Sequence, residues 1–277
     1  MSTVAAAISR DPAVRREVPA KPVRLRQVIY SEWIKITTLR STWYVLVFTI
    51  LGMVGIGAIA SAVSAAHWDS MRATSRATFS PVDTSLTGVA LAQMIIAVLG
   101  VLLTTGEYTT GMVRSSLSAV PRRLPVLWAK LAVSAALSLI VSVVGGLMAF
   151  LVGQALLGSH STTLNESHAM PAILGAAFYL MTITVVASAV GFILRSTAGG
   201  IATVLGVLLV VPVIGNVLPA SWQHHLMPYL PSNAGNAVYA VHPYNDALST
   251  GGGLIALCIW IVATSTIAAV LLRRRDA

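Results

Sequence analysis

Long apolar runs, interrupted by short polar segments, form the dominant pattern of the chain. Six windows contain no acidic or basic residue, and each has the roughly 20 residues that a helix needs to cross a hydrocarbon layer about 30 Å thick. They cover residues 43–66, 86–105, 131–157, 171–194, 199–220 and 253–272. Because the apolar residues are continuous rather than alternating, the pattern predicts an all-α membrane protein with six transmembrane helices, not a β-barrel.

The segment before the first window, residues 23–41, has apolar residues at helical spacing on one face and basic residues on the other. This pattern predicts an amphipathic helix in the membrane interface. Glu32 falls within the apolar face, where an unpaired carboxylate is unfavourable. A local pair with Lys35 or a contact to the loop after the second window would satisfy it. Residues 1–22 contain prolines and charges but no apolar core, so we expect a disordered tail rather than a signal peptide.

Composition agrees with a membrane protein and argues against a soluble fold. Of the 277 residues, 56% are hydrophobic and only 10% are charged, and the mean hydropathy is +0.81. So few charged residues cannot cover the core of a soluble domain of this length with a polar surface.

Basic residues are distributed very unevenly over this predicted topology. Sixteen of the 18 Lys and Arg residues fall on one side: eight precede the first window, four lie between the second and third, Arg195 lies between the fourth and fifth, and three follow the last. Only Arg72 and Arg76 fall on the other side. The positive-inside rule therefore predicts that both termini are cytoplasmic. It also accounts for the net charge of +9 without a nucleic-acid partner, for which the chain has no binding motif.

A basic segment from Gly106 to Lys130 separates the second window from the third. Gly106 is predicted to end the second span, and Gly111 and Pro121 are predicted to bracket a short helix with one apolar side. Two interpretations are open at this point. The segment is either an ordinary connection that obeys the positive-inside rule or a docking surface for a soluble partner.

Three stretches together resemble the membrane subunit of type-2 ABC transporters, particularly the short permeases of actinobacteria. They are SEWIKITTLRSTWYVL at 31–46, GEYTTGMVRSSLSAVPRRLPVLWAK at 106–130 and LPSNAGNA at 230–237. The resemblance implies a multi-pass permease of the bacterial plasma membrane that acts as an exporter. It also implies two partners, a second permease subunit and a separate ATPase subunit that holds ATP and Mg²⁺.

The same resemblance assigns roles to individual residues. The segment after the second span is similar to the family's coupling helix, which implies that force is transmitted by Glu107, Tyr108, Arg114, Pro121, Arg122 and Arg123. The interfacial helix resembles the family's elbow helix, with Glu32 and Trp33 as candidates. The stretch before the last span resembles short re-entrant helices of an outer gate, with Leu230, Pro231 and Asn233; an interfacial loop anchor is the alternative for that stretch.

The chain has no ATPase site of its own by sequence. It contains no GxxxxGK[ST] motif, and only five residues follow the last window, so ATP hydrolysis is expected in a separate polypeptide. It also lacks a GxSxG motif and paired carboxylates, so we expect no enzymatic activity. An ATP-independent six-span channel or carrier is the alternative, although such carriers usually place ionisable residues in their spans, and the windows contain none that is acidic.

Small and polar residues in the windows, and histidines outside them, suggest structural roles. Serines and threonines at helix contacts are expected to donate hydrogen bonds between helices, and Gly52, Gly55 and Gly57 are expected to allow close helix approach. The histidines lie in predicted outer loops without the spacing of metal ligands, so we expect no metal site: His67, His160, His168, His224, His225 and His242.

Overall fold

The computed structural model describes residues 25–109, 111, 123–166, 168–215, 217, 219–244 and 247–274. Within these ranges the regular structure is helical and contains no strand. Six helical segments are long and apolar enough to cross a bilayer: Arg40–Ala66, Val89–Thr109, Leu124–His160, Ala169–Leu194, Thr197–Gly215 and Thr250–Arg274. Each overlaps one of the six predicted windows, so the all-helical, six-span pattern is confirmed.

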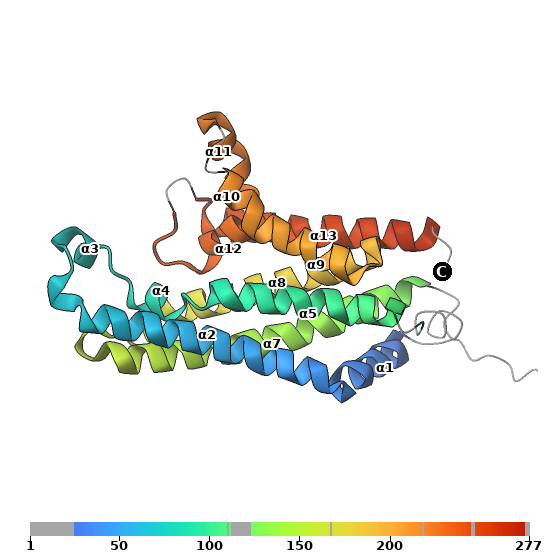
Figure 1. The fold of residues 1–277 in the computed structure, drawn as a ribbon, viewed down its shortest axis with the longest axis horizontal. Helices are drawn as coiled ribbons and strands as arrows, with labels where there is room; N and C mark the ends of the chain where they lie inside the picture. The colour runs from blue at the N-terminus through green and yellow to red at the C-terminus, as the bar shows by residue number, and fades with distance from the viewer. Residues whose placement is uncertain are drawn as a thin grey trace, which may run out of the picture.

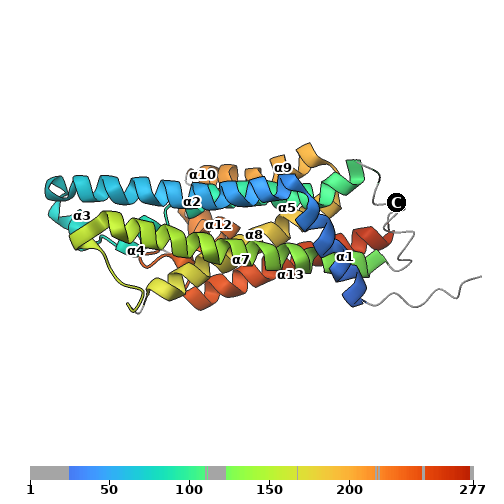
Figure 2. The same cartoon turned by 90° about the horizontal axis from the view of Figure 1, so that it is seen from below.

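The long helices run side by side along the longest axis of the molecule (Figure 1, Figure 2). They are α2 (Arg40–Ala66), α5 (Val89–Thr109), α7 (Arg123–Leu157), α8 (Ala169–Leu194) and α13 (Thr250–Arg274). The central helix is α8, which packs against α5, α7 and α13, while α2 packs against α5 and α7. Because α8 packs against these three long helices and also against the shorter α9 (Thr197–Leu205) and α12 (Pro231–Tyr239), it is the most buried span.

One end of this bundle gathers the segments that sequence predicts on the basic side. The N-terminal ends of α2 and α7, the C-terminal ends of α5 and α13, and helix α1 (Leu25–Thr38) all lie there (Figure 1, Figure 2). We call this the charged end. The short helices η1 (Trp68–Ser70), α3 (Ala73–Ala77) and α4 (Pro81–Ser85) lie at the opposite end.

The second span differs from its prediction at both ends. It starts at Val89 rather than at residue 86, and a separate short helix, α4, precedes it. Ser80 caps the start of α4 by accepting a hydrogen bond from the Asp83 amide at 3.1 Å. The second span continues through Gly106 to Thr109, so the prediction that Gly106 ends it is wrong. The turn glycine is Gly111, whose φ of +72° lies in the left-handed region that glycine adopts without a steric cost.

The third and fifth spans also have different bounds. Helix α7 starts at Arg123, eight residues before the predicted start of the third span at residue 131. The fifth span comprises α9 (Thr197–Leu205), a π-helical turn (Gly206–Val210) and α10 (Val211–Gly215), and it stops five residues before the predicted end. Pro212 lacks an N–H group and is the second residue after the π turn, close to where the helical hydrogen-bond ladder has to adjust.

Hydrogen bonds from polar side chains and close approach at small residues hold the spans together, as predicted for most of the residues concerned. Between α5 and α8, Ser188 Oγ donates to the Gly100 carbonyl at 2.9 Å and Thr104 Oγ1 donates to the Ser188 carbonyl at 3.1 Å. A Cβ atom on Gly57 would overlap the Ser85 carbonyl, so this glycine is required for close approach. A Cβ atom on Gly55 would meet no atom within 4 Å, so its predicted role in close helix approach is wrong.

Short helices fill the segment before the last span. They are α11 (Ala220–Leu226), η4 (Met227–Tyr229) and α12 (Pro231–Tyr239). Helix α12 packs against α8 and α13, and a Cβ atom on Gly235 would overlap the buried ring of Tyr179. In Figure 1, α10 and α11 stand away from the bundle axis. Short helices are therefore present where sequence predicts them.

Candidate functional site

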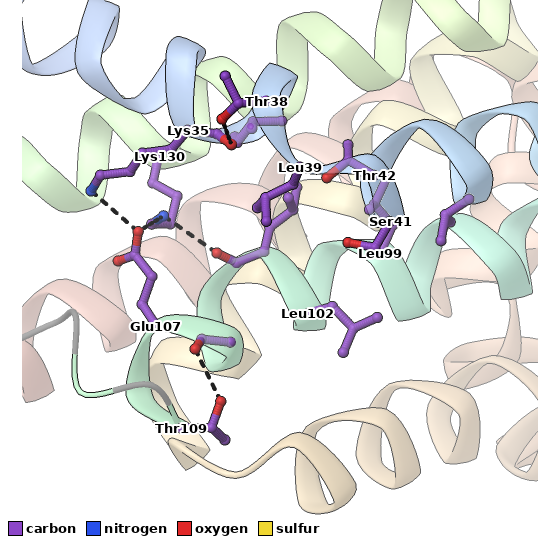
Figure 3. Close-up of a pocket in the computed structure, with 14 residues that line it drawn as sticks. Lys35, Thr38, Leu39, Ser41, Thr42, Leu99, Leu102, Glu107, Thr109 and Lys130 are labelled. Atoms are coloured by element: carbon purple, nitrogen blue, oxygen red, sulfur yellow. Dashed lines mark hydrogen bonds and ion pairs between the residues drawn. The ribbon is translucent and has the colours of Figure 1, made fainter.

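Four charged side chains meet at the charged end of the bundle, and we call them the charged cluster: Glu32, Lys35, Glu107 and Lys130. Helix α1 supplies the first two, the last turn of α5 supplies Glu107, and α7 supplies Lys130. Figure 3 shows Lys35, Glu107 and Lys130 converging from these three helices. Glu32 and Lys35 are one helical turn apart, but the cluster as a whole spans nearly 100 residues of sequence, so tertiary packing brings its three helices together.

Lys130 is the centre of the cluster. Its Nζ lies 2.7 Å from Glu32 Oε2, donates to Glu107 Oε1 at 2.9 Å and donates to the Leu103 carbonyl at 3.3 Å. Lys35 Nζ donates to Glu32 Oε1 at 2.7 Å and to Glu107 Oε1 at 3.3 Å. Two ammonium groups and two carboxylates therefore neutralise one another within hydrogen-bonding distance.

The cluster is largely withdrawn from solvent. The side chains of Glu32 and Lys130 are each 2% exposed, that of Glu107 is 14% exposed and that of Lys35 is 28% exposed. Removing a charge from water is costly, so isolated groups at these positions would not remain ionised. The close pairing of opposite charges in the cluster offsets this desolvation cost.

The ion pairs shift the titration of the two residues on α1. Burial by itself would raise the pKa of Glu32, but the Lys130 charge and hydrogen bonds from Lys130 and Lys35 outweigh it, so the pKa lies below its usual value. Burial would likewise lower the pKa of Lys35, but its bonds to Glu32 and Glu107 raise it above the usual value. Both groups are therefore held in their charged forms over a wide pH range.

Helical spacing explains why Glu32 is buried, and sequence alone predicts it. Val28, Glu32 and Ile36 recur every four residues and all three are buried on the same face of α1. Glu32 makes both of the contacts that the sequence suggested for it. One is the local pair with Lys35, and the other is with Lys130, the last residue of the segment between the second and third windows, which lies near the start of α7. The helix ends at Thr38, where Leu39 adopts an extended conformation before α2 begins.

Lys130 and Arg195 are the residues at this end that sequence analysis counts as topological charges but misses as site residues. With α7 starting at Arg123, Val126, Leu127 and Lys130 share a buried face, a signal hidden by placing Lys130 in a loop. Arg195, at the end of α8, places its guanidinium 5.4 Å from the centre of the Tyr108 ring. This contact joins the last turn of α5 to the turn between α8 and α9.

The other predicted residues of this site are distributed as follows. Glu107 and Tyr108 lie in a helix rather than in the predicted loop. Trp33 lies on α1 and is 39% exposed, so it is not part of the charged cluster. Arg123 begins α7, and three predicted coupling residues lie outside the described residues: Arg114, Pro121 and Arg122.

The three predicted outer-gate residues lie at the turn between η4 and α12 and in the first turn of α12. Leu230 is extended and precedes α12, Pro231 occupies the first helical position and is buried, and Asn233 Nδ2 donates to the Met227 carbonyl at 2.8 Å. Trp260 of α13 donates from Nε1 to the Tyr229 carbonyl at 2.9 Å. These contacts hold the turn in place against the last span.

Asp83 is a residue at the opposite end that sequence analysis misses. Its carboxylate accepts hydrogen bonds from the backbone N–H groups of Val241 at 2.7 Å and His242 at 3.0 Å. It thereby fastens the chain after α12 to α4. No local pattern predicts the contact, because the partners are backbone groups almost 160 residues away. Among the described residues, no His, Cys, Asp and Glu side chains form a group that could hold a metal ion.

By length and composition, the six apolar helices define a multi-pass helical membrane protein. Comparisons with known protein families and with curated proteins give no match. The functional assignment is therefore built on the charged cluster, on the segment that it flanks and on the sequence resemblance.

Proposed function

We propose that this chain is the permease subunit of an ATP-driven ABC exporter and that the charged cluster couples it to a separate ATPase subunit. The resemblance of 31–46, 106–130 and 230–237 to type-2 permeases supports this function, as do the six apolar helices. The sequence also lacks a phosphate-binding motif, so the energy has to come from a partner. A second permease subunit completes the proposed transporter.

One observation carries the proposal. Glu107 and Lys130 lie on the two sides of residues 110–122, the segment proposed as the coupling helix, and they contact each other at 2.9 Å. Both also contact α1, through Lys35 and Glu32 respectively. A displacement of the coupling segment by the ATPase therefore acts at once on α5, α7 and α1.

The charged cluster suits force transmission because its members are paired and buried. Separating α1 from α7 would break the ion pair between Glu32 and Lys130 and leave each of them with one charged partner instead of two in a poorly solvated site, which is unfavourable. The three helix ends therefore move as one body. In this proposal the charged end faces the cytoplasm, and α11, η4 and α12 form the outer gate.

The test is coupling between the permease and a co-expressed ATPase that carries a Walker motif. We expect the two proteins to purify together in a two-plus-two complex and expect ATP hydrolysis to be stimulated by transport. Arg114→Ala and Glu107→Gln should reduce this stimulation with little effect on membrane insertion. Arg72→Ala, on the predicted outer side, is the matched control.

The proposal fails if both variants retain full coupling, or if the reconstituted permease transports without ATP; the latter result would favour the channel or carrier. Sidedness is tested independently by a cysteine at Ser116 in a Cys258→Ser background. Labelling of intact cells with an impermeant thiol reagent should leave that cysteine unmodified. Modification from outside would place the coupling segment on the wrong side of the membrane.

A further inference from the structure

A cavity of about 510 Å³ lies beneath the junction of α1 and α2, against α5 and the start of α7 (Figure 3). Its volume is in the range of pockets that hold small ligands, about 300–1,000 Å³. One part of its wall is polar and includes Lys35, Ser41 and Thr42, and another part is apolar and includes Leu99 and Leu102. The cavity therefore suits a molecule with a polar end and an apolar end.

The polar part of the wall includes the first turn of a long helix. Helix α2 begins at Arg40, and Leu39 before it offers no side chain to cap the first backbone N–H groups. Ser41 and Thr42, in that first turn, line the cavity. An uncapped helix N-terminus carries a partial positive charge and favours an anionic ligand.

Thr42 gives independent evidence for a ligand at this place. The residue is 3% exposed and lines the cavity, and its hydroxyl has no hydrogen-bond partner among the described residues. Figure 3 shows this side chain beside those of Leu39 and Ser41. The hydroxyl oxygen is not one of the fully enclosed polar atoms, so it is accessible from the cavity and can form a hydrogen bond there. A ligand oxygen in the cavity would satisfy it.

The charges around the cavity favour a negative head group. The charged cluster is neutral as a whole, so it supplies no net attraction for a ligand. Arg40 adds an exposed positive charge between two residues that line the cavity, and the described part of the chain contains no ion pair to it. Arg26 adds another exposed positive charge on α1. Cations therefore exceed carboxylates on α1 and the first turn of α2.

The position of the cavity along the spans identifies the source of the ligand. Because α2 starts at Arg40 and is long and apolar enough to cross a bilayer, its first turn is expected at the level of the lipid head-group phosphates. Leu99 and Leu102 belong to α5, deeper in the same bundle. We propose that the cavity binds an anionic phospholipid of the surrounding bilayer, with its phosphate at the first turn of α2 and one acyl chain against α5.

Binding of this lipid is tested with purified, delipidated full-length protein titrated with phosphatidylglycerol or phosphatidylcholine and followed by native mass spectrometry. We expect one phosphatidylglycerol molecule to bind at least about tenfold more tightly than phosphatidylcholine. Leu102→Trp fills the apolar wall and should weaken phosphatidylglycerol binding by about tenfold. The matched control is Leu139→Trp on α7, because Leu139 is 37% and Leu102 is 39% exposed.

Thr42→Val tests the head-group end without relying on the tryptophan. Valine has a similar shape and removes a hydroxyl that lacks a protein partner, so the fold should be retained while phosphatidylglycerol affinity falls. Equal affinities for the two lipids would overturn the proposal, as would equal effects of Leu102→Trp and Leu139→Trp. None of these measurements involves ATP or transport, so the result is independent of the proposed exporter function.

Discussion

Replacing Lys130 by methionine tests whether the charged cluster holds the charged end together. The substitution keeps an unbranched side chain but removes the ammonium group that lies 2.7 Å from Glu32 and 2.9 Å from Glu107. One carboxylate is then in excess, because only Lys35 remains to neutralise two. Removing one partner of a buried ion pair costs about 3–5 kcal/mol. We expect the lower end of that range, since Lys35 still binds both carboxylates.

The assay measures the free energy of unfolding by denaturant titration of the protein in mixed micelles. Arg26→Met on α1 is the control, because Arg26 is exposed and a surface substitution should change stability by less than about 0.5 kcal/mol. Adding Glu32→Gln to Lys130→Met removes the excess charge and should recover about 1–3 kcal/mol. The reasoning is refuted if Lys130→Met costs no more than Arg26→Met, or if Glu32→Gln makes Lys130→Met still less stable.

Two further predictions follow from the pKa shifts and from close packing. The pKa of Glu32 is lowered in the folded protein, so its contribution to stability is fully present above the unfolded pKa of 4.5 and is lost as pH falls through the folded pKa. The pKa of Lys35 is raised in the folded protein, so its contribution is fully present below the unfolded pKa of 10.5 and is lost as pH rises through the folded pKa. Unfolding titrations from pH 3 to 11 check this, and an acid loss unchanged in Glu32→Gln would contradict it. Gly235→Ala should destabilise by about 1–3 kcal/mol, because its new Cβ overlaps the Tyr179 ring, whereas Gly55→Ala should be neutral or stabilising. Thermal unfolding of both variants provides the comparison, and equal melting temperatures would rule out the packing argument.

The charged end of the bundle and the opposite end differ in how they are held. At the charged end, ion pairs between side chains join α1, α5 and α7. At the opposite end, Asp83 binds two backbone amides, and glycine contacts allow α12 to approach α8 and α13. Two backbone hydrogen bonds at a half-buried carboxylate are easier to open than a buried four-charge cluster. This difference is compatible with a rigid charged end and a more easily opened opposite end.

Sequence alone determines that this is a multi-pass helical membrane protein. A helix that spans a bilayer must be long and apolar, and each of the six uncharged windows meets both requirements. It also predicts that Glu32 faces inward, since helical spacing depends only on local geometry. The ends of the spans are less predictable. Glu107 and Lys130 look like loop residues until their partners are known, because a charge is tolerated inside a helix bundle only when an opposite charge lies beside it.

Tertiary structure alone decides which charges on different helices meet. The pair of Glu32 and Lys130 joins residues from different helices, and no periodicity along the chain encodes that distance. The contact of Asp83 with backbone amides after α12 is undetectable for the same reason, since any residue can supply an amide. The cavity under the α1–α2 junction likewise exists only because Leu39 interrupts the helix and α5 packs beneath it. Hydrophobic length is a local property of a sequence, whereas partner choice depends on how the helices pack.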